Sequence, residues 1–449
     1  MHAGHARRSR DQSRIRSLSA ARYPTPLDGQ RPRRSGRYPA TPWSEARLYR
    51  PFVLAAIFCG LGGFPTGGLL LAGVIATDDA IEVHATLQLI GWCGLFVLGI
   101  AMHVVPRFQD NAAITFPWPQ RLGLGLIVGG LVGGAMARIE VGGAEADVIS
   151  AISAIAVGAG MLTAAVTLGR VLRYPSTSPR PVTHWLWLGT AGACLTAMLY
   201  ATHGIAQAGG LPGPEAAYWR RAYHGTALYL FILPFAFGIS ARAFAGLLAW
   251  RPRRYLLDRV AVALLGASGI TVAAGEVLGR RDVADAGALG VACAILAFLA
   301  GVRALERPEM LMHPAWFRRL LRLAHLWLAC AAVLIGWSAL DSLGFEVRGE
   351  RATRPALHAL TVGYLTVLIL VGAARLLPLF EGRARRFQVA LPVAVFALTT
   401  STVVRTLDAF VALPSAWVYA AAGLGAAGYV VGVTPLLTLL LSARRPGGR

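Results

Sequence analysis

The stretch from Glu82 to Phe108, EVHATLQLIGWCGLFVLGIAMHVVPRF, indicates most clearly how this chain folds. It is long and apolar enough to cross a bilayer as an α-helix, since about 20 apolar residues span the hydrocarbon layer. It also contains His84 near one end and His103 near the other, roughly 28 Å apart at about 1.5 Å per helical residue. Ionisable side chains are costly inside a membrane and usually have a function. These two histidines are therefore candidate functional residues.

Two later stretches repeat the pattern of the first. HGTALYLFILPFAFGISARAFAGL begins at His224, and HALTVGYLTVLILVGAARLLPLF begins at His358. Each opens on a histidine, continues with apolar residues, and has a glycine 14 residues after the histidine (Gly238 and Gly372). In the first stretch, Gly99 follows His84 by 15 residues. The first and third stretches also end alike, in VVPRF and LLPLF. The three histidines stand 140 and 134 positions apart, and this period predicts three related units.

The composition is that of a polytopic membrane protein. Hydrophobic residues make up 55% of the 449 residues, charged residues only 14%, and the mean hydropathy is +0.55. All 43 basic residues are arginine, and they fall in the tails and in short connections between apolar runs. That placement is typical of membrane topology, so the net charge of +21 does not indicate nucleic-acid binding. The five cysteines form no CxxC pair, which argues against a disulfide framework or a thiolate zinc site.

The predicted fold class is all-α, a polytopic membrane protein of twelve transmembrane helices in three four-helix units. We expect residues 1–50 to be a disordered basic cytoplasmic tail, residues 51–442 the membrane domain, and residues 443–449 a second cytoplasmic tail. The predicted spans are Pro51–Thr77, Ile81–Pro106, Gln120–Ile139, Asp147–Leu172, His184–Ala208, Tyr218–Leu248, Tyr255–Leu278, Val283–Ala304, Leu320–Leu343, Ala352–Pro378, Phe387–Leu407 and Leu413–Ser442.

The orientation of the spans follows from the arginines. They are more frequent in the connections that lie on the same side of the membrane as the N-terminus. Both termini are therefore predicted to be cytoplasmic. His84, His224 and His358 then begin the second, sixth and tenth spans, which all run from outside to inside. The three rings are predicted to lie at one depth near the outer surface. His203, at the end of the fifth span, reaches the same side, whereas His103 lies on the inner side.

Three histidines at one depth favour a metal or haem site over separate interhelical hydrogen bonds, the ordinary role of a single buried histidine. Neutral imidazole suits haem iron or copper, and the lack of clustered carboxylates points away from calcium and magnesium. Gln88, four residues after His84, is expected on the same helix face. His203 is a further metal candidate on the outer side, and His103 is a candidate for a second site.

Two arginines near the inner ends of the sixth and tenth spans, Arg242 and Arg375, allow two interpretations. Their guanidinium groups can extend to lipid phosphate. Alternatively, they pair with a haem propionate or another anionic ligand, although a haem near the outer surface would be on the wrong side for them.

The segments HATLQLIGWCGLFVLGIAMHVVPRF and RPALHALTVGYLTVLILVGAARLLPLF resemble the NnrS family, membrane proteins that contain haem and copper and are linked to nitric oxide stress. More distantly, histidines in spans 2, 6 and 10 of twelve resemble the catalytic subunit of haem-copper oxidases. The resemblance implies a bacterial inner-membrane location, haem ligands at His84 and His358, and a copper position at His224. It also implies a small diatomic ligand such as nitric oxide.

The chain departs from the oxidase pattern in its copper residues. Oxidases have a pair of histidines in the seventh span, and Tyr255–Leu278 contains none. Here His358 is followed by Ala359 and Leu360 rather than by a second histidine, and Leu228 stands where oxidases have a tyrosine. A complete three-histidine copper centre is therefore not expected, nor is oxygen reduction. Proton pumping has no visible path, because acids such as Glu276, Asp341 and Asp408 lie at outer span ends.

The sequence thus predicts a haem-binding membrane protein of nitric oxide or nitrosative-stress metabolism, in contact with membrane lipid and not with nucleic acid. Copper is a second candidate cofactor, with His224, His203 and His103 as candidate metal ligands. Two other classes remain open. One is a twelve-span secondary transporter, although such carriers usually have two six-helix halves and polar midplane groups. The other is a structural membrane subunit without a cofactor.

Overall fold

The structure is a computed structural model in which the described residues are 47–71, 74–75, 77–109, 114, 117–140, 144–176, 178–209, 213–248, 254–306, 315–343, 352–381, 389–411 and 413–442. The predicted tail of residues 1–50 lies almost wholly outside the described residues, and the tail of residues 443–449 lies wholly outside them.

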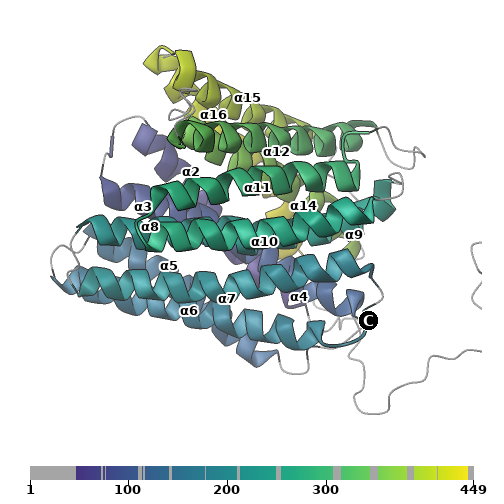
Figure 1. Cartoon of the computed structure of the whole chain (residues 1–449), viewed down its shortest axis with the longest axis horizontal. Helices are drawn as coiled ribbons and strands as arrows, with labels where there is room; N and C mark the ends of the chain where they lie inside the picture. The colour runs from purple at the N-terminus through teal and green to yellow at the C-terminus, as the bar shows by residue number, and fades with distance from the viewer. Residues whose placement is uncertain are drawn as a thin grey trace, which may run out of the picture. The chain divides into compact units, whose positions relative to one another are not determined.

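The described residues form helices and no strand, which confirms the all-α prediction (Figure 1). Each of the twelve predicted spans corresponds to one long helical segment. Three segments are interrupted by short π-helical stretches, labelled η. The segments are α2 (Tyr49–Leu71); α3–η1–α4 (Asp78–Thr86, Leu87–Gly94, Leu95–Phe108); α5 (Trp118–Glu140); α6 (Ala144–Leu172); α7 (Arg180–Ala208); α8–η2–α9 (Gly213–Thr226, Ala227–Ile232, Leu233–Leu248); α10 (Tyr255–Val277); α11 (Arg281–Val302); α12 (Ala315–Ser342); α13–η4–α14 (Thr353–His358, Ala359–Thr366, Val367–Phe380); α15 (Ala390–Val411); and α16 (Ser415–Leu441).

Eleven of these described segments are long and apolar enough to cross a membrane, which supports a polytopic membrane protein. The remaining segment, α7, is equally long but less hydropathic, because threonines, glycines and tryptophans interrupt its apolar residues. It nevertheless packs between α6 and the α8–η2–α9 segment, as a member of the same bundle.

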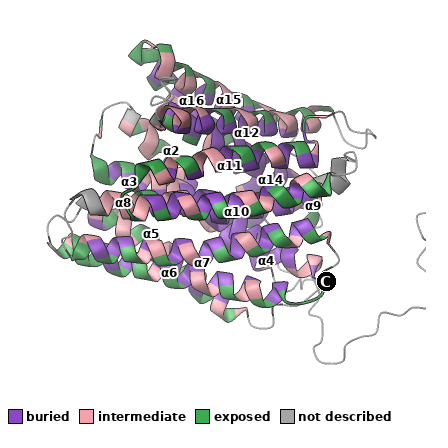
Figure 2. Ribbon diagram, in the orientation of Figure 1, coloured by how far each residue is buried: buried purple, intermediate pink, exposed green. Residues whose placement is uncertain are grey.

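The three interrupted segments are the most enclosed part of the bundle. In their most apolar windows, 94%, 89% and 78% of the residues are buried, against 28–56% in the other eight candidate spans. In Figure 2 the buried residues accordingly gather on the helix faces that point inward, and the exposed residues face outward. The core of the described part of the protein therefore consists of the three segments that contain His84, His224 and His358.

The surrounding helices pack around this core in a recurring order. α5 pairs with α6, α10 with α11, and α15 with α16. α6 then packs on α7, α11 on α12, and α16 on α2, so that the helices form a closed ring. Figure 1 shows one side of this ring, where α7, α10, α11 and α12 lie side by side. At the closing contact, the Tyr429 hydroxyl of α16 donates a hydrogen bond of 3.1 Å to the Ile57 carbonyl oxygen of α2.

A π-helical stretch follows each of the three histidines. η1 and η2 begin three residues after His84 and His224, and η4 begins directly after His358. A π-helix bonds residue i to residue i+5, which widens the turn, and such stretches often occur at functional sites. No sequence pattern predicted these stretches.

The π-helical stretches also contact one another. The Trp92 indole N–H of η1 donates a hydrogen bond of 3.1 Å to the Thr366 hydroxyl of η4. The Phe231 ring of η2 packs on Gly94 of η1, where a Cβ would lie 3.2 Å from the ring. The three core segments therefore run in parallel. We call the end that holds the three histidines the outer end, and the end at which α4, α9 and α14 finish the inner end.

Candidate functional site

His84 lies against the glycine-rich face of α2. Its Nδ1 is 2.8 Å from the Gly63 carbonyl oxygen. Because a carbonyl oxygen only accepts, Nδ1 carries the proton and Nε2 keeps its lone pair. Gly67 makes the approach possible, since a Cβ at that position would lie 2.7 Å from Nδ1. Gln88 packs against Gly63 on the same face, as expected from its spacing.

His358 has the same hydrogen-bond arrangement. Its Nδ1 is 2.9 Å from the Arg354 carbonyl oxygen, four residues earlier in α13, so Nδ1 is again the donor and Nε2 the acceptor. A histidine held in this way by a backbone carbonyl has its other ring nitrogen available to a metal. Two histidines of the three core segments therefore have the tautomer that an iron ligand requires.

These two histidines share one electrostatic environment. His358 lies within electrostatic range of His84, and both rings lie within range of the Arg405 guanidinium of α15. The Arg354 guanidinium also acts on His358. Both residues are partly exposed, so neither is close-packed on every side.

His224 belongs to a different group. Its ring packs on Tyr223, with the ring centres 4.3 Å apart, and its Nε2 is buried without a hydrogen-bond partner. It lies within electrostatic range of Glu82, Arg220 and His203. The structure thus brings His224 near His203, for which the sequence had predicted only the same side of the membrane.

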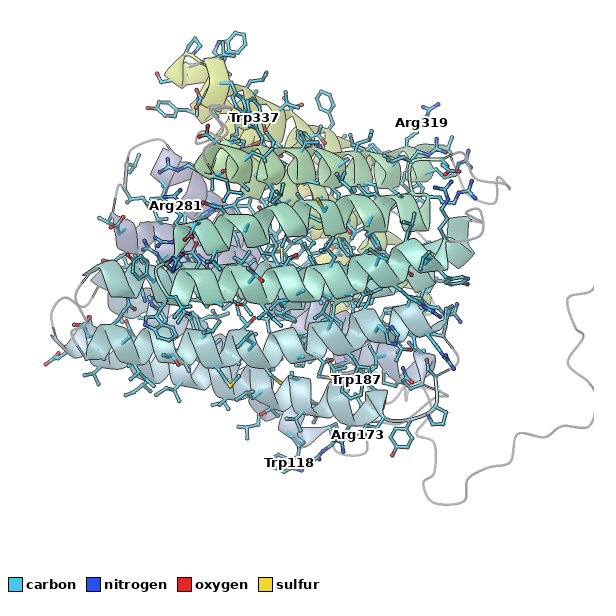
Figure 3. The ribbon with its side chains drawn as sticks, viewed as in Figure 1. Trp118, Arg173, Trp187, Arg281, Arg319 and Trp337 are labelled. Atoms are coloured by element: carbon cyan, nitrogen blue, oxygen red, sulfur yellow. The ribbon has the colours of Figure 1, made fainter. Side chains whose placement is uncertain are left out.

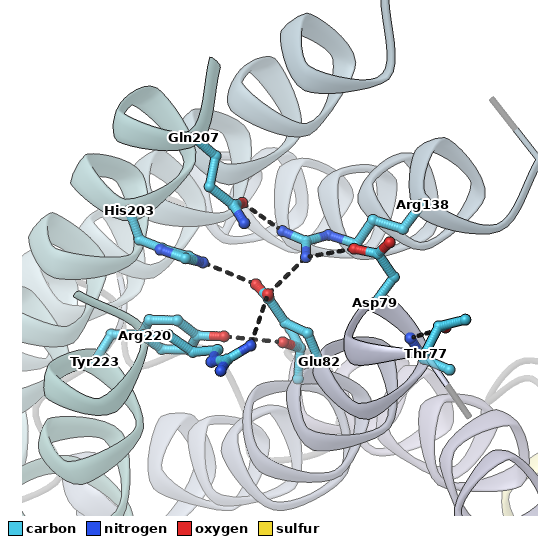
Figure 4. Close-up of polar contacts among 10 residues, drawn as sticks. Thr77, Asp79, Glu82, Arg138, His203, Gln207, Arg220 and Tyr223 are labelled. Carbon is cyan, nitrogen blue, oxygen red and sulfur yellow. Dashed lines mark hydrogen bonds and ion pairs between the residues drawn. The ribbon is translucent and has the colours of Figure 1, made fainter. Parts of the chain in front are cut away.

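Glu82 is the centre of this second group (Figure 4). Its Oε1 lies 2.9 Å from His203 Nε2, and its Oε2 lies 2.6 Å from Arg138 Nη1 and 4.0 Å from Arg220 Nη1. The side chain is only 5% exposed. We call this group the Glu82 cluster; its other members are Asp79, which lies 3.8 Å from Arg138, and Gln207, which accepts a hydrogen bond of 2.7 Å from Arg138.

The Glu82 cluster joins four helices, α3, α5, α7 and α8. A carboxylate buried among two guanidinium groups and a histidine is stabilised by its charged partners. Glu82 was not among the acids that the sequence predicted at outer span ends. Its signal was present, because an acidic residue at the start of an apolar span needs a partner. Glu82 also lies two residues from His84, and side chains two residues apart in a helix point in different directions.

His103 lies at the inner end and does not join the other histidines. Its ring packs between Tyr49 and Phe380, with ring centres 4.6 Å and 4.0 Å away. The Arg107 guanidinium donates to the His103 carbonyl oxygen at 3.1 Å. His103 is therefore part of an aromatic contact between α2, α4 and α14.

Among the described residues, no three His, Cys, Asp or Glu side chains are grouped as a metal site would require. His203 already bonds Glu82, and His103 is at the other end of the bundle from His224. The structure brings together two groups of histidines, His84 with His358 and His203 with His224 beside Glu82. In the first group a backbone carbonyl holds Nδ1 of both rings.

No family model matches the chain, and no curated protein is significantly similar to it.

Proposed function

We propose that this chain is a haem-binding membrane protein of the NnrS type, in which His84 and His358 would hold the haem iron. The observation that supports this most directly is the shared tautomer of the two rings, each held at Nδ1 by a backbone carbonyl and leaving Nε2 to bind. The two rings come from different core segments, lie within electrostatic range of each other, and belong to residues that are only partly exposed.

The charges around the pair fit the group. Haem iron accepts imidazole nitrogen, and the macrocycle carries two carboxylates. Arg405 and Arg354 place two guanidinium groups near His358, and these can pair with carboxylates. They are at the outer end, unlike Arg242 and Arg375, which the sequence had offered as propionate partners. Asp408 lies within electrostatic range of Arg405 and partly compensates its charge. With Arg354 the site still has a net positive charge.

The proposed role is in nitric oxide or nitrosative-stress metabolism. A bound haem supplies an iron that takes up diatomic ligands such as nitric oxide. The residues of the chain hold and orient the group and enclose it in an apolar core that keeps bulk water away.

The proposal includes an organisation and a location. We infer three four-helix units, supported by the recurring helix contacts and by the π-helical stretch that follows each histidine. We also infer a bacterial inner membrane, as the resemblance to the NnrS family implies, and the arginine distribution supports cytoplasmic termini. Copper is proposed only as a second metal at His224 and His203, and no step is assigned to it.

The test is the haem content of purified protein from haem-replete cells. We expect a Soret band and about one haem per chain in the wild type. His84→Ala and His358→Ala should each lose most of the haem, because one of the two proposed iron ligands is removed. The matched control is His184→Ala, since His184 is exposed on α7. Metal analysis of the same preparations reports copper.

Two outcomes would contradict the proposal. A colourless, metal-free wild type would favour the transporter or the structural subunit. Full haem content in both histidine variants would mean that the ligands are wrong.

A further inference from the structure

Arg375 of α14 is a basic residue of the core that forms no ion pair with the described residues. Its Nε and Nη1 atoms are buried and have no hydrogen-bond partner among them. Burying a cation without a partner costs several kcal/mol, so buried guanidinium groups are almost always paired. The charge of Arg375 therefore calls for an anion that the described protein residues do not supply.

The position of Arg375 recurs in the other core segments. Arg375 stands three residues before Pro378, as His103 stands three before Pro106. Arg242 stands four residues after Gly238, as His103 stands four after Gly99. Each core segment thus has a basic side chain at nearly the same level of the inner end.

The inner ends of the core segments also meet. The His103 ring of α4 packs on Phe380 of α14, with ring centres 4.0 Å apart, and the Arg107 guanidinium lies 5.7 Å from the Phe380 ring centre. The Arg242 guanidinium of α9 lies 5.7 Å from the ring centre of Phe108 at the end of α4. Basic groups are therefore concentrated where α4, α9 and α14 finish.

The acidic side chains described at this end already have partners. Glu381 accepts hydrogen bonds from Tyr49 and Arg50, the latter from Nε at 2.6 Å, and pairs with Arg47 at 3.5 Å. Asp258 accepts from the Trp185 indole at 2.9 Å. In the described part of the inner end, no such acid is left over for Arg375.

We propose that Arg375 is the anchor of a binding site for a phosphate-bearing anion at the inner end of the core. Arg375 lies five residues before the end of α14, about 7.5 Å at ~1.5 Å per residue, so its side chain can reach the level of lipid phosphate. A lipid headgroup phosphodiester and a free phosphate offer the same acceptor chemistry. The site is separate from the proposed haem, since His358 lies 17 residues, about 25 Å, from Arg375 along the same segment.

Gln109 strengthens the inference that this end is completed by a bound group. Its side chain is fully buried at the end of α4, and neither its amide nitrogen nor its amide oxygen has a partner. Buried amide groups in proteins are nearly always hydrogen-bonded, to protein or to a bound molecule.

The experiment is a lipid titration of the full-length protein, followed by native mass spectrometry. Phosphatidylglycerol is added to protein purified in detergent, and inorganic phosphate is added in a second arm. We expect the wild type to retain phosphatidylglycerol and Arg375→Gln to bind it about 10- to 100-fold more weakly, as the loss of a charge-assisted hydrogen bond implies. Arg375→Lys keeps the charge and should lose less.

The control is Arg173→Gln. Arg173 is exposed and projects from the same end of the helices as Arg319, opposite Arg281 (Figure 3), so this variant should bind as the wild type does. Binding of inorganic phosphate but not of lipid, with the same dependence on Arg375, would identify a soluble anion and support the site. Arg375→Gln binding both probes like the wild type, or no binding of either probe by the wild type, would overturn the proposal. Haem content does not enter either readout.

Discussion

The position of the His84 ring depends on Gly67, which has no side chain. A Cβ at Gly67 would come within 2.7 Å of His84 Nδ1, whereas a Cβ at Gly68 would meet nothing within 4 Å. We expect Gly67→Ala to displace the ring and lower the free energy of unfolding by about 1–3 kcal/mol. Gly68→Ala should leave the free energy of unfolding unchanged or raise it by up to about 1 kcal/mol, since alanine favours the helical conformation. Unfolding in detergent measures both, and equal effects would contradict the packing argument.

Glu82 gives a second prediction for a single residue. Glu82→Gln removes the carboxylate that faces Arg138 and leaves a buried guanidinium without its counter-charge. We expect a loss of about 3–5 kcal/mol in the free energy of unfolding. Asp79→Asn is the matched control, because Asp79 also approaches Arg138 but is 60% exposed, and should change the stability by less than about 1 kcal/mol. An unchanged free energy of unfolding in Glu82→Gln would mean that the Glu82 cluster does not stabilise the protein.

The residue scale also shows what the sequence could and could not predict. The period of His84, His224 and His358 correctly placed all three at the start of core segments. It did not separate His84 and His358, which share Arg405, from His224, which faces Glu82. The direction of a side chain depends on the rotation of its helix, and the π-helical stretches change that rotation. Composition and spacing contain no information about them.

At the scale of elements, one hydrogen bond joins two π-helical stretches. Thr366 accepts from the Trp92 indole and donates to the Thr361 carbonyl oxygen, 2.9 Å away and five residues earlier. Thr366→Val leaves the buried indole N–H without an acceptor, so we expect a loss of about 1–3 kcal/mol in the free energy of unfolding.

The control for this element is Thr361→Val. The Thr361 hydroxyl bonds only within its own helix, to the Leu357 carbonyl oxygen at 2.7 Å. Its replacement should change the stability by less than about 0.5 kcal/mol. Comparable losses in both variants would show that the cross-link between η1 and η4 contributes nothing of its own.

Hydropathy located the elements well, because each of the twelve expected spans is a helical segment. The boundaries depended on local chemistry that hydropathy does not measure. The second span begins at Asp78 rather than Ile81, since the Thr77 hydroxyl accepts a hydrogen bond of 3.1 Å from the Ala80 N–H and caps the helix. Two acidic residues in the first turn, Asp78 and Asp79, further favour this start.

At the scale of the whole molecule, Glu381 at the end of α14 connects the third core segment to the start of α2. Burial raises its pKa, but hydrogen bonds from Arg50 and Tyr49 outweigh burial, and the pKa lies below the ordinary value of 4.5. The stabilisation is therefore complete above pH 4.5 and is lost as the pH falls through the lowered pKa. Unfolding measured from neutral to acid pH should show this loss in the wild type and a smaller one in Glu381→Gln. Identical profiles would exclude the contribution.

The contact between α16 and α2 has a consequence for how the protein is made. Tyr429 fills the space beside Gly60, where a Cβ would come within 3.0 Å of the tyrosine ring. α2 is the first of the described helices to be synthesised and α16 the last, so this face of α2 is covered only at the end of synthesis. Until then, lipid or another protein must cover it. Joining the two ends by a linker and opening the chain at another connection would remove that delay, and such a permuted protein should insert with fewer misassembled intermediates.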